Sequence, residues 1–132
     1  MDAYIKFENN VLEEDSYNLQ QLANLIEEEC DLSVNIEKAD AQPGVRDGGL
    51  AIGLAIASLA LTAIQTLISV LQYWESKQPK YSLSVTFHSP TNKKTLLLES
   101  SSEKEIQAAM SQLQSQSSPE YVDVEVKISK KQ

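Results

Sequence analysis

The chain has 132 residues, with 19 acidic residues against 11 lysines and arginines, so its formal net charge at pH 7 is −8. A chain of this length builds one adequate core, and we expect residues 1–132 to form a single domain. The acidic balance repels phosphate groups and anionic membrane surfaces, which argues against a general nucleic-acid binder.

The cysteine and histidine content limits the chemistry further. Cys30 is the single cysteine, which excludes an internal disulfide framework, and His88 is the single histidine, which excludes a metal site built from histidine and cysteine clusters. Residues 1–10 lack the basic and then apolar pattern of a secretory signal. We therefore expect a reducing, cytoplasmic location and no metal or cofactor.

The first third of the chain predicts a strand, a helix and a second strand. Residues 4–7 have the composition of a short strand. From residue 19 to residue 26 apolar side chains recur on one helical face, and Asp15 or Ser16 can cap this helix by accepting a backbone N–H bond. Residues 32–37 then alternate between apolar and polar, which is typical of a half-buried strand.

The last third predicts two strands, a helix and a final strand. Residues 83–87 and 96–98 are separated by turn-forming residues, which indicates a hairpin. Ser102 and Glu105 form a capping box in front of an amphipathic helix. Residues 122–128 alternate again, as in a strand with one wet face. The polar side chains of that wet face are Asp123, Glu125 and Lys127.

The centre of the chain is a run without charge, from Gly48 to Trp74. At about 1.5 Å per residue a helix of this length could cross a hydrocarbon core of about 30 Å. Polar residues at steps of three and four, however, indicate an amphipathic helix that lies along protein. They are Ser58, Thr62, Gln65, Thr66, Ser69, Gln72 and Ser76. We predict one long hydrophobic helix over about residues 48–76, with membrane association as an alternative.

The order of these elements predicts an α+β fold. Each short helix connects two strands, as in a right-handed crossover. The most economical arrangement is a two-layer, ferredoxin-like sandwich of β-α-β and β-β-α-β halves, with helices on one face of the sheet. The long hydrophobic helix is inserted between the two halves.

The N-terminal end of this predicted helix is the expected interaction site. Gly49, Gly53 and Ala57 recur at every fourth residue, and small residues at that spacing let two helices approach closely. The partner of this stripe is either the protein's own helices or another subunit or protein, because an exposed apolar patch normally marks an interface. The residues expected to bind a partner are Gly49, Leu50, Ile52, Gly53, Leu54 and Ala57.

Catalytic motifs are weak. His88 lies beside a predicted turn, Cys30 has no second histidine to activate it, and no phosphate-binding loop with its lysine is present. We therefore expect a protein that is not an enzyme. Residues 41–49 form a polar linker, and cleavage after Arg46 or Asp47 by a partner peptidase would free the end of the helix.

The pattern over most of the chain resembles a known family. The glycine- and alanine-rich segment from Gly48 to Trp74 is followed by the strands at residues 83–87 and 96–98 and the helix at residues 106–113. This order resembles the effector-associated constant component family of prokaryotic conflict (defence) systems. The resemblance implies a non-enzymatic adaptor or regulatory component that binds an effector, such as a caspase-like or trypsin-like peptidase.

Two other functions stay open, as does the oligomeric state. Small α+β domains can block a protease with a sheet face or a loop, so the protein is alternatively an inhibitor or cleavable substrate of a partner peptidase, engaged through residues 41–49. The second alternative is a membrane-associated component that releases its hydrophobic helix. A homo-oligomer is compatible with the glycine and alanine stripe.

Overall fold

The computed structural model describes residues 2–8, 11–38, 50–57, 59–88, 93–98, 103–114 and 123–130. These residues form a mixed fold of strands and helices, which confirms the predicted α+β class. Its elements are β1 (Asp2–Phe7), α1 (Glu13–Cys30), β2 (Asn35–Lys38), β3 (Ala51–Ile56), α2 (Leu61–Lys77), β4 (Tyr81–His88), β5 (Lys93–Leu97), α3 (Glu103–Gln114) and β6 (Asp123–Lys130). Within the described residues, none of the helices has both the length and the apolar character that a membrane span requires.

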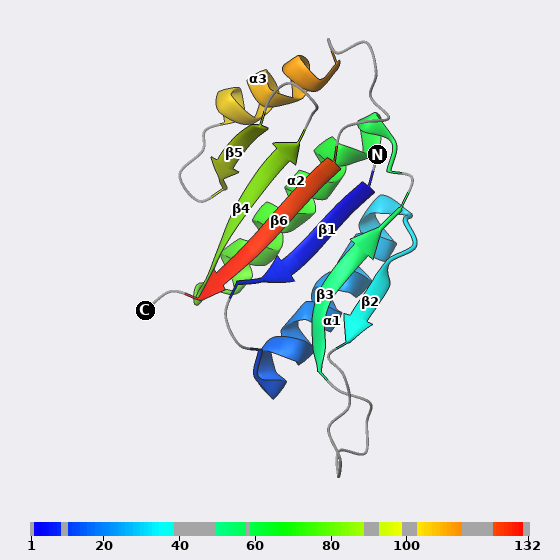
Figure 1. Ribbon diagram of the computed structural model, residues 1–132, viewed down its shortest axis with the longest axis vertical. Coiled ribbons are helices and arrows are strands. Elements are labelled where there is room, and N and C mark those ends of the chain that lie inside the picture. Colours follow the sequence, from blue (N-terminus) through cyan, green and yellow to red (C-terminus); the bar gives the residue numbers. More distant parts are fainter. Residues whose placement is uncertain are drawn as a thin grey trace.

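The strands form a six-stranded sheet in the order β2-β3-β1-β6-β4-β5 (Figure 1). The central pair, β1 and β6, is parallel, and the other neighbouring pairs are antiparallel. The predicted hairpin is confirmed, since β4 pairs directly with β5. The ferredoxin-like detail is not confirmed, because the sheet contains β3, a strand that the sequence pattern assigned to a helix.

The helices α1 and α2 cover one face of the sheet. In Figure 1 β3 passes in front of α1, and β6 and β4 pass in front of α2, which carries the chain from β3 past β1 and β6 to β4. The two helices pack against each other, α1 also against β3 and α2 against β4. No described helix lies over the opposite side of β1, β6 and β4. We call that side of the sheet the open face.

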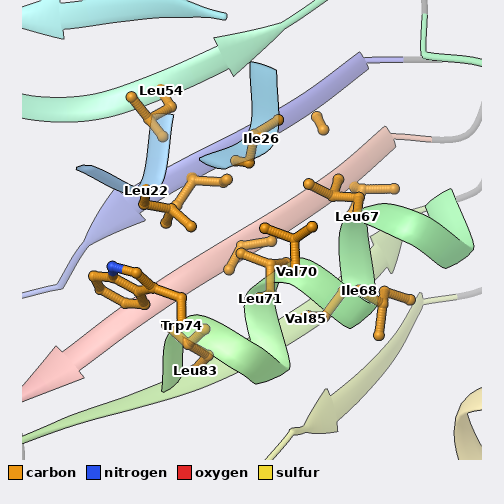
Figure 2. Packing of buried hydrophobic residues seen from close by; sticks show 14 of the residues in the cluster. Leu22, Ile26, Leu54, Leu67, Ile68, Val70, Leu71, Trp74, Leu83 and Val85 are labelled. Atoms are coloured by element: carbon orange, nitrogen blue, oxygen red, sulfur yellow. The ribbon is translucent and has the colours of Figure 1, made fainter. Parts of the chain in front are cut away.

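The core lies between the sheet and these two helices (Figure 2). The amphipathic pattern predicted for the second half of the uncharged segment is confirmed, because its apolar stripe is buried and its polar stripe is exposed. The buried stripe of α2 includes Ile64, Leu67, Leu71 and Trp74. The exposed stripe includes Gln65, Thr66, Ser69, Gln72 and Ser76. Together with the strand residues Ile5, Leu54, Leu83 and Val126 this core removes much apolar surface from water, the main favourable contribution to folding.

The predicted long helix over residues 48–76 is wrong in its first half. Residues 51–56 form β3, between β1 and β2, and the helix begins only at Leu61. A short apolar run has no periodicity that separates a buried strand from a buried helix, and here pairing with strands on both sides decides. Gly53 permits this close pairing, because a Cβ there would lie 3.0 Å from the carbonyl oxygen of Ile5.

Smaller shifts occur at two other predicted elements. The strand expected over residues 32–37 begins only at Asn35, while Leu32 and Val34 pack against the core in front of it. The helix expected after a cap at Asp15 or Ser16 begins at Glu13, three or four residues earlier than such a cap implies. The capping chemistry is nevertheless present, since the Asp15 carboxylate accepts a hydrogen bond from the backbone N–H of Leu12 at 2.9 Å.

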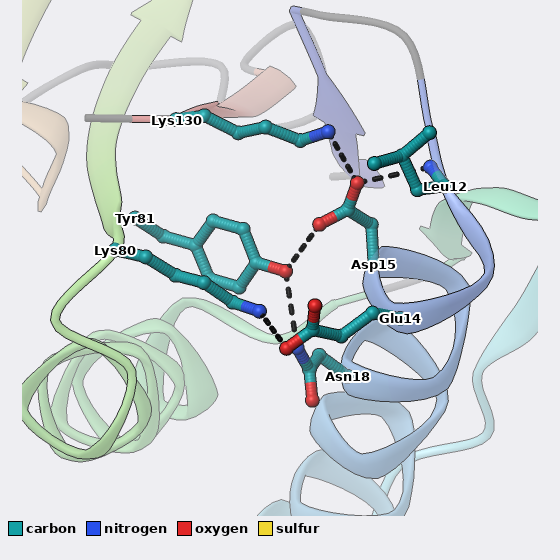
Figure 3. A network of polar contacts seen from close by, with 7 residues as sticks. All are labelled: Leu12, Glu14, Asp15, Asn18, Lys80, Tyr81 and Lys130. Carbon is teal, nitrogen blue, oxygen red and sulfur yellow. Dashed lines mark hydrogen bonds and ion pairs between the residues drawn. The ribbon is translucent and has the colours of Figure 1, made fainter. Parts of the chain in front are cut away.

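A buried polar network joins the start of α1 to the start of β4 and the end of β6 (Figure 3). The Tyr81 hydroxyl donates to Asp15 Oδ1 at 2.6 Å and accepts from Asn18 Nδ2 at 3.0 Å. Lys130 forms an ion pair with the other oxygen of Asp15. Trp74 stacks on the Tyr81 ring with centroids 5.3 Å apart. The network therefore fastens three distant segments of the chain at one end of the core.

The pKa shifts in this network show how its charges are held. Burial alone would raise the pKa of Asp15, but hydrogen bonds from Lys130, Tyr81 and the Leu12 N–H outweigh it and leave this pKa below its usual range. Burial, and then the hydrogen bond to Asp15, raise the pKa of Tyr81. Asp15 is therefore held as a carboxylate and Tyr81 as a neutral phenol.

Candidate functional site

The helix tip on which the partner-binding surface was predicted is not present, because the described residues of that surface lie on or beside β3. Leu54 is fully buried in the core, and Gly53 is also buried, between β1 and β2. Leu50 is half-buried, while Ile52 and Ala57 are exposed. The pairing of β2 with β3 shifts register between Glu37 and Lys38, so that Ile52 and Leu54, two residues apart, differ in burial. The described residues of this set therefore form no continuous exposed stripe.

Three of the residues that the sequence marked for binding or cleavage lie outside the described part of the chain. They are Arg46, Asp47 and Gly49. The cleavage-loop hypothesis for residues 41–49 therefore stays a prediction.

The open face brings together polar side chains from the three strands β1, β6 and β4. The register pairs Tyr4 with Glu125 and Asp2 with Asp123 across β1 and β6. It pairs Asp123 with His88 across β6 and β4. Because side chains alternate along a strand and these residues sit opposite the buried positions, they point away from the helices. The predicted wet face of the last strand, which contains Asp123 and Glu125, thus lies at the middle of this surface.

A shallow hollow of about 340 Å³ lies on the open face. We call it the central hollow, and its lining residues are Tyr4, Lys6, His88, Asp123 and Glu125. His88 Nε2 lies 3.0 Å from Glu125 Oε2, and each of these side chains is 37% exposed. Lys127 Nζ lies 3.9 Å from the other oxygen of Glu125. The hollow is therefore ordered by contacts within the sheet and stays open to solvent.

Carboxylates outnumber lysines on the open face. The register places Lys6, Lys127 and Lys93 at positions on this face, with Lys93 paired to His88. The carboxylates on the same face are Asp2, Glu37, Asp123 and Glu125. The pKa of the Tyr4 phenol reflects this excess, because Asp2 most strongly, and then partial burial, Asp123 and Glu37, raise it. The open face therefore favours a cationic ligand.

The described residues of the hollow do not form a nucleophile arrangement. His88 contacts a carboxylate, and no described hydroxyl or thiol is hydrogen-bonded to it. Thr86, on the same strand, pairs with Thr95 at 2.9 Å instead. No group of three or more histidine, cysteine, aspartate or glutamate side chains in the described ranges is placed to hold a metal ion.

Cys30, the other candidate nucleophile, lies at the C-terminal end of α1. Its thiol is half-buried, and burial, followed by the nearby Glu29, raises its pKa. A raised pKa lowers the fraction of thiolate, which is the reactive form.

A second hollow, of about 380 Å³, lies between α1 and α2. Its lining residues are Leu25, Glu29, Thr66, Ser69, Val70 and Tyr73. We call it the helix hollow. Only one of its lining side chains, Glu29, is charged, and α2 presents an uncharged polar surface beside it. The helix hollow therefore has fewer charged groups with which to select a partner than the central hollow has.

No family model, curated protein or solved structure matches this chain. Its function is therefore inferred from its own residues.

Sequence patterns identified only part of the central hollow. The alternation of residues 122–128 correctly marked Asp123 and Glu125 as polar strand positions, but Tyr4 and Lys6 attracted no functional interpretation. No local pattern says that β1 and β6, which are more than a hundred residues apart in the chain, pair in parallel. Only the tertiary pairing brings Tyr4 beside Glu125.

Proposed function

We propose that the protein is a non-enzymatic adaptor or regulatory component that binds an effector protein through the open face of its sheet. The observation that carries this proposal is the contrast between the two faces. One face is closed by α1 and α2, whereas the other presents a charged, hollowed surface over β1, β6 and β4. A sheet face that its own helices leave uncovered is available to another protein.

The composition of the open face fits a protein partner with a basic surface. A non-obligate interface carries polar and charged groups over a large area, and complementary charge sets both the partner and the association rate. The excess of carboxylates around Tyr4, together with the net charge of −8, disfavours phosphate-rich ligands. The partner proposed here is an effector such as a caspase-like or trypsin-like peptidase, as the sequence resemblance implies.

Complex formation with an effector tests the proposal. The protein is purified together with a candidate effector peptidase, and the mass of the complex is measured by light scattering after size-exclusion chromatography. Ser84→Trp places a bulky group on the open face, where Ser84 lies beside Lys127 and Leu97. Ser69→Trp places the same group in the helix hollow and serves as the matched control.

We expect Ser84→Trp to weaken the complex at least about tenfold, while Ser69→Trp changes its affinity less than about threefold. Glu125→Lys provides a second variant that acts through charge instead of size, and it should weaken the complex as well. Melting temperatures verify that the three variants remain folded. The proposal fails if the two proteins form no complex, or if only Ser69→Trp disrupts it.

A further inference from the structure

We infer that the central hollow is a recognition pocket for a cationic side chain, arginine or lysine, that the partner protein presents. This inference rests on the proposed function and names the chemistry that the open face recognises. The carboxylates of Asp123 and Glu125 stand on neighbouring outward positions of β6, and the ring of Tyr4 lies beside them on β1. Carboxylates next to an aromatic ring form the usual surroundings of a bound guanidinium or ammonium group.

The size of the hollow fits a side chain. A volume of about 340 Å³ lies at the small end of the range for ligand sites, which is roughly 300–1,000 Å³. The hollow is shallow and open to solvent, so a residue that projects from a partner's surface can reach it. Drug-sized ligands, by contrast, usually need a site that encloses most of their surface.

Among the described side chains, the charges around the hollow leave the Asp123 carboxylate without an ion pair. Lys6 is directed to Glu37 on the far side of Gly53, with Nζ 4.0 Å from the carboxylate oxygen. Glu125 is shared between His88 and Lys127, but Asp123 has no ion pair with a described lysine or histidine. Asp123 is exposed and lines the hollow. A guanidinium in the hollow would form an ion pair with Asp123 and stack on the ring of Tyr4.

Contacts within the sheet orient the Glu125 carboxylate that lines this pocket. His88 Nε2 lies 3.0 Å from one of its oxygens and Lys127 Nζ lies 3.9 Å from the other, so both oxygens have a partner before any ligand arrives. Preorganised groups spend less binding free energy on ordering than mobile ones do. His88 and Lys127 are therefore positioning residues, while Tyr4, Asp123 and Glu125 contact the ligand.

A short labelled peptide tests this inference without the effector. The probe is a fluorescein-labelled Gly-Ser peptide that carries three arginines, and its affinity is measured by fluorescence anisotropy in 50 mM salt. The same peptide with citrulline in place of arginine keeps the shape and loses the charge. We expect the arginine peptide to bind at least about tenfold more tightly than the citrulline peptide.

Two charge-matched double variants separate the pocket from the general attraction of an acidic protein. Asp123→Asn with Glu125→Gln removes two carboxylates from the central hollow. Glu28→Gln with Glu29→Gln removes two carboxylates from the exposed end of α1, and Glu29 is the one that lines the helix hollow. The first variant should bind the arginine peptide at least about tenfold more weakly, and the second should remain within about twofold of the unmodified protein.

Tyr4→Leu adds a variant that leaves the charge unchanged. It should weaken binding of the arginine peptide about two- to fivefold through loss of the ring alone. The inference is overturned if both double variants lose affinity equally, if the citrulline peptide binds as well as the arginine peptide, or if the arginine peptide does not bind at millimolar concentration. Melting temperatures show whether each variant is folded.

The outcomes for the pocket and for the proposed function are distinguishable. If the arginine peptide fails but the effector complex forms and Ser84→Trp disrupts it, the open face is a docking surface and the hollow is not a cation pocket. If binding of the peptide depends on Asp123 and Glu125 but no effector complex forms, the cation pocket is supported and the adaptor function is contradicted.

Discussion

The two faces of the sheet are made by the same strands, but one packs against helices and the other is exposed to solvent. On the face covered by helices polar groups are few, and the buried carboxylate of Asp15 is bound to Tyr81, Lys130 and the backbone N–H of Leu12. On the open face, carboxylates stand in water around Tyr4. Alternation along β1, β4 and β6 keeps the two sets apart, so substitutions on the open face can change binding while the core and its network keep the fold.

The largest expected effect contrasts two neighbours on β3. Leu54 is fully buried, and Leu54→Ala should lower the free energy of unfolding by about 2–5 kcal/mol through lost burial and the cavity left behind. Ile52 is 37% exposed, and Ile52→Ala should cost less than about 1 kcal/mol. Urea unfolding measures both. If the two substitutions lowered the free energy of unfolding equally, the assignment of these residues to a strand would be wrong, because a helix tip available to a partner would expose both of them.

The Tyr81 hydroxyl should matter next. Tyr81→Phe leaves Asp15 without one donor and Asn18 without its acceptor, in a buried setting, and should cost about 1–3 kcal/mol. Tyr17→Phe removes the same hydroxyl from a side chain that is 62% exposed, and it should change stability by less than about 0.5 kcal/mol. Thermal unfolding compares the two. A Tyr81→Phe protein as stable as the unmodified one would show that the network contributes nothing.

Acid should reveal the same network. The pKa of Asp15 is lower in the folded protein than in the unfolded chain, so its carboxylate stabilises the fold above the unfolded pKa of about 4. That stabilisation is lost as the pH falls through the folded pKa. Asp15→Asn removes this titration, so the difference in stability between the two proteins should shrink between pH 6 and pH 2.5. A difference that is constant over this range would contradict the assigned shift.

The smallest expected effect lies on the open face. Glu125→Gln removes a charge from an exposed pair with His88, and exposed ion pairs contribute little to stability. We expect the free energy of unfolding to change by less than about 0.5 kcal/mol, as measured by urea unfolding. A loss of 2 kcal/mol or more would mean that the open face holds the fold together as the covered face does.

Sequence patterns predicted the elements that carry a clear period. Residues 122–128 alternate, and they form most of β6. The polar steps from Gln65 to Ser76 and the apolar steps from Ile64 to Trp74 predicted the two sides of α2. In each case one side of the element contacts the core and the other contacts water, so the spacing of apolar residues in the sequence follows the burial of their side chains.

Patterns failed where an element is apolar on both sides. Residues 50–57 carry no polar position, and a strand paired on both edges produces the same sequence as a buried helix. Gly53 was interpreted as part of a small-residue helix stripe, although its role is to let β3 approach β1. The sequence did contain one indication, because the amphipathic pattern begins only after residue 57, which places a boundary inside the uncharged run.

The open face as the binding surface can be tested most directly by nuclear magnetic resonance of the labelled protein. Backbone amide shifts are recorded while the arginine peptide is added. We predict that the largest changes occur at residues of β1, β4 and β6 around the central hollow, including Tyr4, His88 and Glu125, while α1 and α2 change little. Changes concentrated at Leu25, Val70 and Tyr73, in the helix hollow, would contradict the account.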